Sequence, residues 1–161
     1  MPKKHTHPTI VVGTDHAGYV LKEIIKEYLL SLDYPVIDKG TFSGATIVDY
    51  PAFIFPVARA VARSAGKKFG VVFGGSGIGE CIAANKVRGV RAALAYDPYT
   101  ARMSREHNDA NVLCLGGRTV TKDPEYAKRL VRIWLETACS KNPRYRRRIK
   151  QVAQYETRTQ R

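Results

Sequence analysis

A chain of 161 residues, 44% hydrophobic and 25% charged, has the size and composition of one ordinary globular domain. No apolar run approaches the roughly 20 residues of a membrane-spanning helix, so neither an integral membrane protein nor a membrane partner is expected. The two lysines near the start precede no apolar stretch, which argues against a signal peptide and favours the cytoplasm. The three cysteines are widely spaced in apolar surroundings, and we expect them to be reduced thiols of the core.

The net charge of +13 is concentrated near the C-terminal end. Residues 141–161 contain eight basic side chains, one acid (Glu156) and only two aromatic side chains. A nucleic-acid interface would need stacking aromatics among the basic residues or a recognisable binding module. We therefore expect no nucleic-acid partner, and a solvated helix face is the simplest interpretation of this charge.

Short apolar runs alternate with helical segments along the chain, in the order strand, helix, strand, helix. Strands are predicted at residues 9–13, 35–38, 70–73, 90–95 and 112–115. Helices are predicted at residues 21–32 and 52–63, from 81, from 98, from 123 to about 139, and at 142–157. The last three helices begin with an Asp-Pro or Asn-Pro pair, which combines an N-cap residue with proline in the first turn.

The predicted strands are apolar without alternation, which is typical of a parallel sheet covered on both faces. The sequence therefore predicts an α/β fold, a Rossmann-like doubly wound sandwich with a five-stranded parallel sheet and an extended C-terminal helix. Residues 9–161 are expected to form this single domain, including the basic helix at 142–157. Residues 1–8 are expected to be a disordered lead.

A glycine-rich loop at residues 74–79 joins an apolar strand to the start of a helix. Gly74 and Gly79 have the spacing of a phosphate-binding P-loop, but Glu80 and Cys81 replace its lysine and its hydroxyl residue. Glycines let backbone N–H groups converge on one point, and a helix start adds partial positive charge there. A carboxylate beside such a cluster suits proton abstraction with stabilisation of an oxyanion. We therefore expect enolate-type chemistry, with Glu80 as the base.

Other candidate groups are expected to converge with this loop beyond the carboxyl ends of the strands, where doubly wound folds bind ligands. They are Asp15 and His16, Tyr50, the pair His107 and Asn108, and Arg118. Each also has a purely structural interpretation, because Asp15 and His16 suit a helix cap and His107 and Asn108 suit a helix-ending turn. Glu80 likewise suits the positive end of a helix dipole.

Two cofactor classes are not expected. The first strand is not followed by the Gly-x-Gly-x-x-Gly fingerprint of dinucleotide-binding folds. No pair of histidines or cysteines has metal-ligand spacing, so no metal is expected.

Arg144 and Arg148 lie four residues apart on one face of the last helix, and Arg144 opposes the helix dipole. Two guanidinium groups on one face suit a phosphate monoester.

In combination, six motifs closely resemble ribose-5-phosphate isomerase type B, a ribose/galactose isomerase family. The resemblance runs from about residue 9 to 155 and rests on residues 13–18, 49–51, 74–79, 83–86, 105–108 and 144–148. It implies interconversion of ribose 5-phosphate and ribulose 5-phosphate through a cis-enediolate, as in the pentose phosphate pathway, without cofactor or metal. It also implies a homodimer, in some members a tetramer, whose active sites borrow residues from the neighbouring subunit.

The resemblance also assigns roles to residues. Asp15 and His107 would handle the sugar ring, with His107 opening it, while Tyr50 and Asn108 would line the sugar pocket. Phosphate would be bound by His16, Arg118, Arg144 and Arg148. The enediolate oxygen would be held by Ser76 and by backbone N–H groups of the loop, at Gly75, Gly77, Ile78 and Gly79.

This sequence departs from many members of the family at the base. Those members carry a cysteine where this chain has Gly74, whereas a subgroup lacks it and carries a glutamate at the position of Glu80. The chain matches the subgroup, so Cys81 is expected to be packed rather than catalytic. A smaller departure is Tyr145-Arg146, where members often have His-Gln.

Two alternative functions stay open at this point. The same fold and loop would serve an isomerase of a six-carbon sugar phosphate, such as allose or galactose 6-phosphate. A non-catalytic protein that binds a sugar phosphate or a nucleic acid is the other alternative. The presence of both Glu80 and His107 speaks against a binding-only role.

Overall fold

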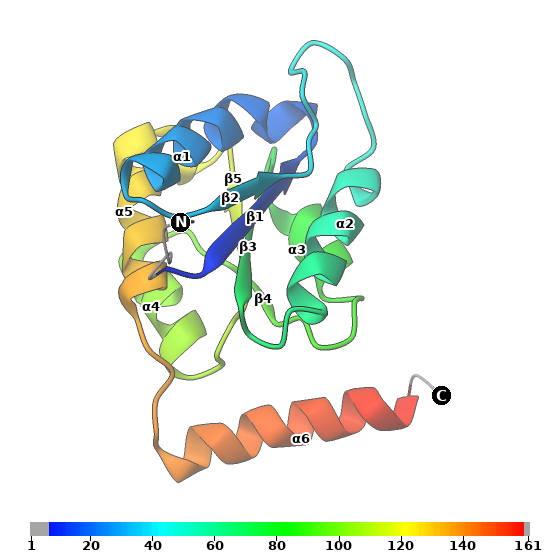
Figure 1. Cartoon of the computed structure of the whole chain (residues 1–161), viewed down its shortest axis with the longest axis vertical. Coiled ribbons are helices and arrows are strands. Elements are labelled where there is room, and N and C mark those ends of the chain that lie inside the picture. Colours follow the sequence, from blue (N-terminus) through cyan, green and yellow to red (C-terminus); the bar gives the residue numbers. More distant parts are fainter. Residues whose placement is uncertain (1–6, 160–161) are drawn as a thin grey trace, which may run out of the picture.

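The computed structural model describes residues 7–159 and is built on a five-stranded sheet in the order β2-β1-β3-β5-β4, with every pair of neighbours parallel (Figure 1). The predicted five-stranded parallel sheet is therefore confirmed. Residues 1–6 of the predicted disordered lead lie outside the described residues. The strands are β1 (Thr9–Thr14), β2 (Val36–Asp38), β3 (Lys68–Gly74), β4 (Ala92–Leu94) and β5 (Val112–Gly116).

Helices cover both faces of the sheet, which explains why its strands are apolar on both sides (Figure 1). In β1, Ile10 and Val12 pack into one core, and Val11 packs into the other. The first core lies under α1 (Tyr19–Ser31), α4 (Pro98–Glu106) and α5 (Pro124–Glu136), and the second under α2 (Pro51–Ala62) and α3 (Ile78–Ala84).

The predicted helix starts are confirmed by side-chain caps. The Asp97 carboxylate accepts from the Thr100 amide at 2.6 Å, and Asp123 accepts from the Glu125 amide at 3.0 Å. Asn142 Oδ1 accepts from the Arg144 amide at 2.9 Å.

Two predicted helix boundaries were wrong. The helix expected from residue 81 begins at Ile78, directly after the left-handed Gly77, and this start puts Glu80 in its first turn. The helix expected to reach about residue 139 ends at Glu136, because Thr137 has an extended backbone.

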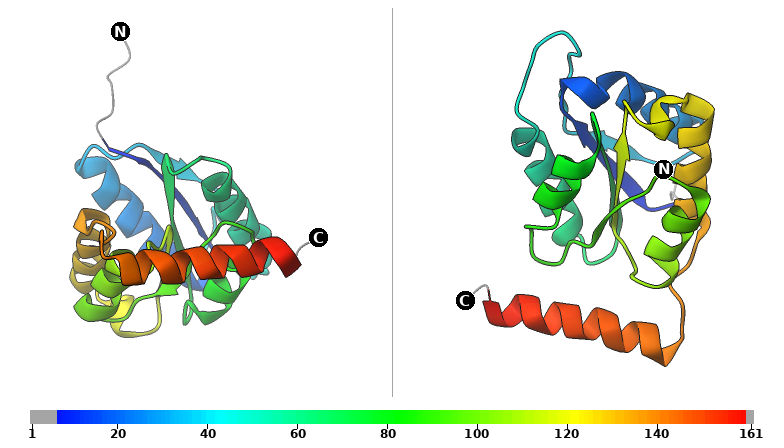
Figure 2. Two further views of the ribbon diagram at one scale, coloured as in Figure 1. Left: turned by 90° about the horizontal axis from the view of Figure 1, so that it is seen from below. Right: turned by 180° about the vertical axis from the view of Figure 1, so that it is seen from behind.

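The last helix, α6 (Pro143–Thr159), lies outside the three-layered body and crosses it at the end opposite the glycine loop (Figures 1 and 2). Near its C-terminal end, both carboxylate oxygens of Glu156 accept from the Gly89 amide at 3.0 Å. Arg88 Nη2 donates to Thr157 Oγ1 at 3.2 Å. Within residues 7–159, no helix combines the length and apolarity needed to cross a membrane.

Candidate active site

The candidate site begins at the crevice between the carboxyl ends of β1 and β3. The chain builds the sheet outward in opposite directions from these two strands, which makes them the topological switch point where such folds bind ligands. The Thr14 hydroxyl ties the two ends together by donating to the Phe73 carbonyl at 2.9 Å. Glycine is required at position 18, because a side-chain carbon there would lie 2.7 Å from the Gly74 nitrogen. The two loops therefore touch.

Glu80 lies at the centre of this crevice. Its side chain folds back from the first turn of α3, and a side-chain carbon added to Gly74 would overlap the Glu80 carboxylate. Only 4% of the residue is exposed. The carboxylate thus occupies the volume in which any side chain at position 74 would begin. A base carried on residue 74 and a base carried on residue 80 would act at the same point in space.

Burial is the main reason why the pKa of Glu80 is raised above its ordinary value. A hydrogen bond from its own backbone amide opposes the rise, and the negative charge of Asp15 adds to it. A raised pKa makes this carboxylate a stronger base than an exposed glutamate once it is ionised. The environment of Glu80 is therefore suited to taking a proton from carbon.

Asp15 is confirmed as a cap, one of the two roles considered for it. Its Oδ1 accepts from the amides of Ala17 at 2.9 Å and Gly18 at 3.1 Å, at the start of the short helix η1 (His16–Gly18). These hydrogen bonds also hold the Asp15 carboxylate close to Glu80, and its negative charge raises the pKa of Glu80. The structural and functional interpretations of Asp15 are therefore compatible.

The glycine loop approaches neighbouring backbone closely. Gly77 has φ of 79°, and a side-chain carbon there would lie 2.9 Å from the Leu115 carbonyl carbon, so glycine is needed on both counts. Ser76 Oγ accepts from the Ile78 amide at 3.2 Å across the turn that leads into α3, and Gly77 is the N-cap residue. The first amides of a helix have no acceptor within the helix, so this end is suited to an anion.

Three further predicted residues line the same edge. Tyr50 lies against the loop: a side-chain carbon added to Gly79 would lie only 2.8 Å from Cζ of the Tyr50 ring. His16 Nδ1 accepts from the Val48 amide at 3.3 Å. Arg118 donates its amide to the Gly75 carbonyl at 2.9 Å, and its side chain passes beside that glycine. We call Asp15, His16, Tyr50, Glu80 and Arg118 the carboxyl-edge cluster.

The expectation that all candidate groups share one edge of the sheet was wrong for His107 and Asn108. They follow α4, which runs back antiparallel to the strands and so ends beside their amino ends. Arg91 precedes β4, and its Nε donates to the Asn108 carbonyl at 3.0 Å. A loop that follows a helix, unlike one that follows a strand, lies at the amino edge of a parallel sheet.

Arg144 and Arg148 belong to the same amino edge. The ring of Tyr145 in α6 stacks on the ring of His107, with centroids 4.0 Å apart. Arg148 and Asn108 line one hollow between α6 and the body. We call His107, Asn108, Arg144 and Arg148 the amino-edge cluster. β3, with seven residues, separates the two clusters by roughly 20 Å.

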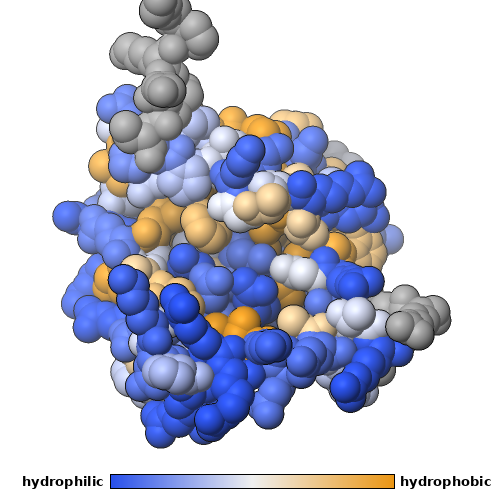
Figure 3. Space-filling model, turned by 60° about the horizontal axis from the view of Figure 1, so that its bottom comes forward, coloured by the Kyte–Doolittle hydropathy of each residue, from blue (hydrophilic) through white to orange (hydrophobic). Residues whose placement is uncertain are grey.

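Apolar surface is exposed beside the amino-edge cluster. Figure 3, in which this end faces the reader, shows apolar patches among the hydrophilic side chains. Ile149 and Val152 of α6 line the hollow, and Val152 is 61% exposed. An apolar stripe on a highly charged helix is unusual for a surface that meets only water.

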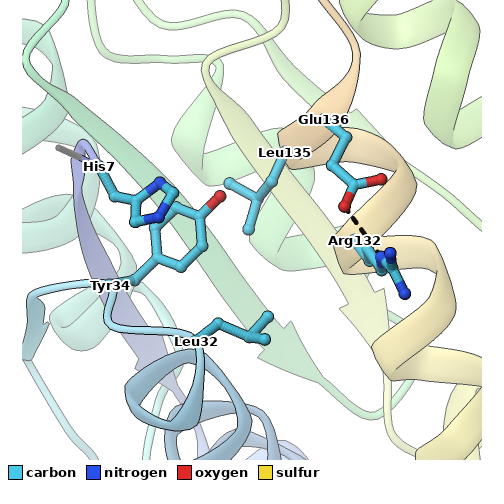
Figure 4. A pocket seen from close by; sticks show the side chains of 6 residues that line it. All are labelled: His7, Leu32, Tyr34, Arg132, Leu135 and Glu136. Carbon is cyan, nitrogen blue, oxygen red and sulfur yellow. Dashed lines mark hydrogen bonds and ion pairs between the residues drawn. The ribbon is translucent and has the colours of Figure 1, made fainter.

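A different hollow lies between the ends of α1 and α5 (Figure 4). Its charged side chains pair with each other, as Arg132 Nε donates to Glu136 Oε1 at 2.8 Å. The rings of His7 and Tyr34 stack with centroids 4.3 Å apart. Because Arg132 and Glu136 neutralise each other, the lining of this hollow, unlike that around Glu80, holds no unpaired carboxylate.

Cys81 lies against β4 and β5. Its Sγ donates to the Ala92 carbonyl at 3.5 Å, and a hydrogen bond with the Cys114 thiol is the main cause lowering the pKa of Cys81. Within residues 7–159, the free thiols are Cys81, Cys114 and Cys139, and no group of three or more metal-ligating side chains occurs.

Sequence reasoning missed Asp109, which follows Asn108 and has a left-handed backbone with φ of 47°. The available signal was an Asn-Asp pair directly after a helix, since these residues adopt this conformation more readily than other non-glycine residues. Of its two side-chain partners, Arg105 lies four residues earlier, a spacing the sequence does show, whereas Arg91 precedes β4 and could not be read from the sequence.

The fold and crevice define a doubly wound α/β protein with a buried carboxylate at its switch point. A sequence model of the ribose/galactose isomerase family matches residues 10–152, and the chain belongs to that family. It is 45% identical to ribose-5-phosphate isomerase B of Mycolicibacterium paratuberculosis, over 91% of each chain.

Solved structures agree with this assignment. Ribose-5-phosphate isomerase B of Clostridium thermocellum is 44% identical, with a TM-score of 0.86 over 93% of this chain and 98% of that one. The enzyme of Mycoplasma genitalium, solved with bound ribulose-5-phosphate, is 39% identical, with a TM-score of 0.88 over 94% and 97%.

The raised pKa of Glu80 predicts a stability penalty. The folded chain binds the Glu80 proton more tightly than the unfolded chain, so stability falls as the pH rises from the ordinary value of 4.5 through the folded pKa. Glu80→Gln removes that loss. We expect the variant to be more stable than the parent at neutral pH, by about 1.4 kcal/mol for each unit of raised pKa.

The measurement is denaturant unfolding across this pH window, and the matched control is Glu27→Gln on the exposed side of α1. A difference between Glu80→Gln and the parent that does not grow with pH would contradict the prediction.

Proposed function

We propose that this chain is a ribose-5-phosphate isomerase, which interconverts ribose 5-phosphate and ribulose 5-phosphate. The observation that carries the proposal is the buried Glu80 carboxylate, held over Gly74 beside a glycine loop at the switch point. The names of the relatives, and the ribulose-5-phosphate bound to one of them, support a five-carbon rather than a six-carbon substrate.

In the proposed mechanism, His107 of a second copy of the chain assists opening of the furanose ring beside Asp15. Ionised Glu80 then removes the proton from C2, and electrons move onto the C1 oxygen to form the cis-enediolate. The C2 hydroxyl proton moves to the C1 oxygen, and the same carboxylate returns its proton to C1 as the C2 carbonyl forms, which gives the ketose with no net acid or base consumed. General-base catalysis of this kind contributes about 10²–10⁴-fold in rate.

The developing negative charge needs donors that are in place before the reaction. Backbone N–H groups of the loop from Gly75 to Gly79, with Ser76, supply them at the start of α3. His16 and Arg118 on one side, and Arg144 and Arg148 on the other, bind the phosphate group. Tyr50 and Asn108 complete the wall of the sugar pocket.

A single chain cannot use both clusters on one substrate, because they lie at opposite ends of β3, roughly 20 Å apart. We therefore propose a homodimer, alone or paired into a tetramer, in which the amino-edge cluster of one copy completes the carboxyl-edge cluster of the other. The exposed apolar stripe of α6 supports this arrangement, since a second copy would cover it.

We place this activity in the cytoplasm. The free thiols of Cys81, Cys114 and Cys139 support a reducing compartment. The partner of the basic α6 is then a second copy and its sugar phosphate, rather than a nucleic acid or a membrane.

The first test separates Glu80 from its neighbour Cys81. Glu80→Gln should lower turnover by about 10²–10⁴-fold, because glutamine keeps the size but cannot accept the proton. Cys81→Ala should stay near the parental turnover, because a packed thiol mainly fills space. Exchange of the substrate C2 proton with solvent deuterium measures the base step directly. If Glu80→Gln exchanged the C2 proton at the parental rate while Cys81→Ala did not exchange it, the assignment of Glu80 as the base would be wrong.

A second test asks whether the site is shared between copies. Glu80→Gln and His107→Ala should each be inactive as pure proteins. After unfolding and refolding in an equal mixture, half of the dimers pair the two variants, and each such dimer holds one intact site. We expect about a quarter of the parental activity to return. No recovery in the mixture, when each variant alone refolds as a dimer, would place both residues in a site within one chain.

A third test concerns the phosphate. Arg144→Ala removes a charge-assisted hydrogen bond of about 1.5–3 kcal/mol, so KM should rise roughly tenfold to a hundredfold. Inorganic phosphate should also inhibit this variant less than the parent. Arg147→Ala removes the same charge from a neighbouring exposed position of α6 and serves as the control. Equal effects of the two substitutions would assign Arg144 to a solvated face.

A further inference from the structure

We propose that Asp109 is a positioning residue for this reaction: it holds the turn that carries His107 and Asn108 in the one orientation that can enter the active site of a second copy. The inference rests on the proposed function, because it assumes that His107 acts on the sugar. Asp109 itself touches no substrate, and its contribution is to keep this turn rigid.

The backbone of this turn is closed by Asp109. With φ of 47°, the residue lies in the left-handed region, where glycine is the usual choice after a helix. Its amide donates to the Arg105 carbonyl at 3.0 Å, and the next amide, of Ala110, donates to the Ser104 carbonyl at 2.8 Å. Glycine would form this backbone with less strain, so the presence of an aspartate calls for a role of its carboxylate.

The Asp109 carboxylate is held by two guanidinium groups from different parts of the chain. Arg105 Nη1 donates to Oδ1 at 2.8 Å, and Arg91 Nη2 approaches Oδ2 at 3.2 Å. The same arginines also bind the turn's carbonyls. Arg91 Nε donates to the carbonyl oxygens of Asn108 and Asp109, both at 3.0 Å. Arg105 Nη1 donates to the carbonyl oxygen of Ala110 at 2.8 Å. The carboxylate thus locks both arginines onto the turn.

Arg105 anchors this arrangement in the core. Its guanidinium lies over the ring of Phe69, 4.7 Å from the centroid, and 5.7 Å from the centroid of the fully buried Trp134. Only 11% of its side chain is exposed. A long side chain fixed in this way loses little further entropy on pairing, so its bond to Asp109 is stronger than an ordinary surface ion pair.

His107 is thereby held from two sides. Its backbone continues into the clamped turn, and its ring stacks on Tyr145 of α6 at 4.0 Å. A group that acts on a substrate bound to another copy must be ordered before the copies meet, because misplacement by 1 Å costs about a hundredfold in rate. Clamping the turn meets this requirement.

The test uses Asp109→Asn in the full-length protein. Asparagine tolerates the left-handed backbone, but one of its two end groups becomes a donor that faces a guanidinium. We expect kcat for ribose 5-phosphate to fall about tenfold to a hundredfold. Erythrose 4-phosphate cannot close a furanose ring, because its 4-oxygen carries the phosphate, so it needs no ring opening and its turnover should fall less. Nuclear magnetic relaxation should show greater mobility of the His107 and Asn108 amides.

The matched control is Asp33→Asn, since Asp33 is an exposed left-handed aspartate with φ of 62° that follows α1 in the same way. It should leave both turnovers at the parental level. Asp109→Gly, which keeps the backbone and removes the carboxylate, should reproduce Asp109→Asn and covers the case in which asparagine impairs folding.

Equal losses on the two sugars, or unchanged mobility of the His107 and Asn108 amides, would overturn the proposal. A parent protein that turns over neither sugar would instead refute the proposed function. The relaxation measurement would still show whether Asp109 orders the turn, so the two failures are distinguishable.

Discussion

The common direction of all five strands is the constraint on which the rest of the structure depends. Each helix must return antiparallel to the sheet, so loops after strands gather at one edge and loops after helices at the other. Glu80 and the glycine loop belong to the first edge, and His107 and Asn108 belong to the second. A chain with this topology carries two partial sites, each directed outward. The assembly that we propose follows from this separation, because only another copy can bring the opposite edge near.

The site also depends on close contact between backbone segments, which glycines make possible. Gly18 lets the first loop touch the third, Gly77 lets the glycine loop pass β5, and Gly74 leaves room for the Glu80 carboxylate. A side chain at position 74 would overlap the Glu80 carboxylate, so the absence of a side chain at Gly74 is what gives this carboxylate its place. The carboxylate is also buried at an energetic cost, which its raised pKa reflects. This loss of stability falls on the residue that we propose as the base.

The basic C-terminal segment acquires a physical role in this structure. α6 holds two arginines and an apolar stripe across the amino edge, anchored at one end by Glu156 and at the other by the stacked rings of His107 and Tyr145. Much of the net charge of +13 is therefore placed where a phosphorylated substrate of a second copy would meet it. Charge concentrated on one helix attracts anions more effectively than the same charge spread over the surface.

Local signals in the sequence were enough for the element order, the parallel sheet, the caps at Asp97 and Asp123, and the glycine loop with Glu80, because each depends on neighbours within a few residues. Helix ends were less predictable, since the start of α3 depends on the left-handed Gly77. The edge on which His107 lies, the overlap of the Glu80 carboxylate with position 74, and the contact of Arg91 with Asp109 were decided by tertiary structure alone. They depend on strand direction and on contacts between distant segments, and no local pattern records these.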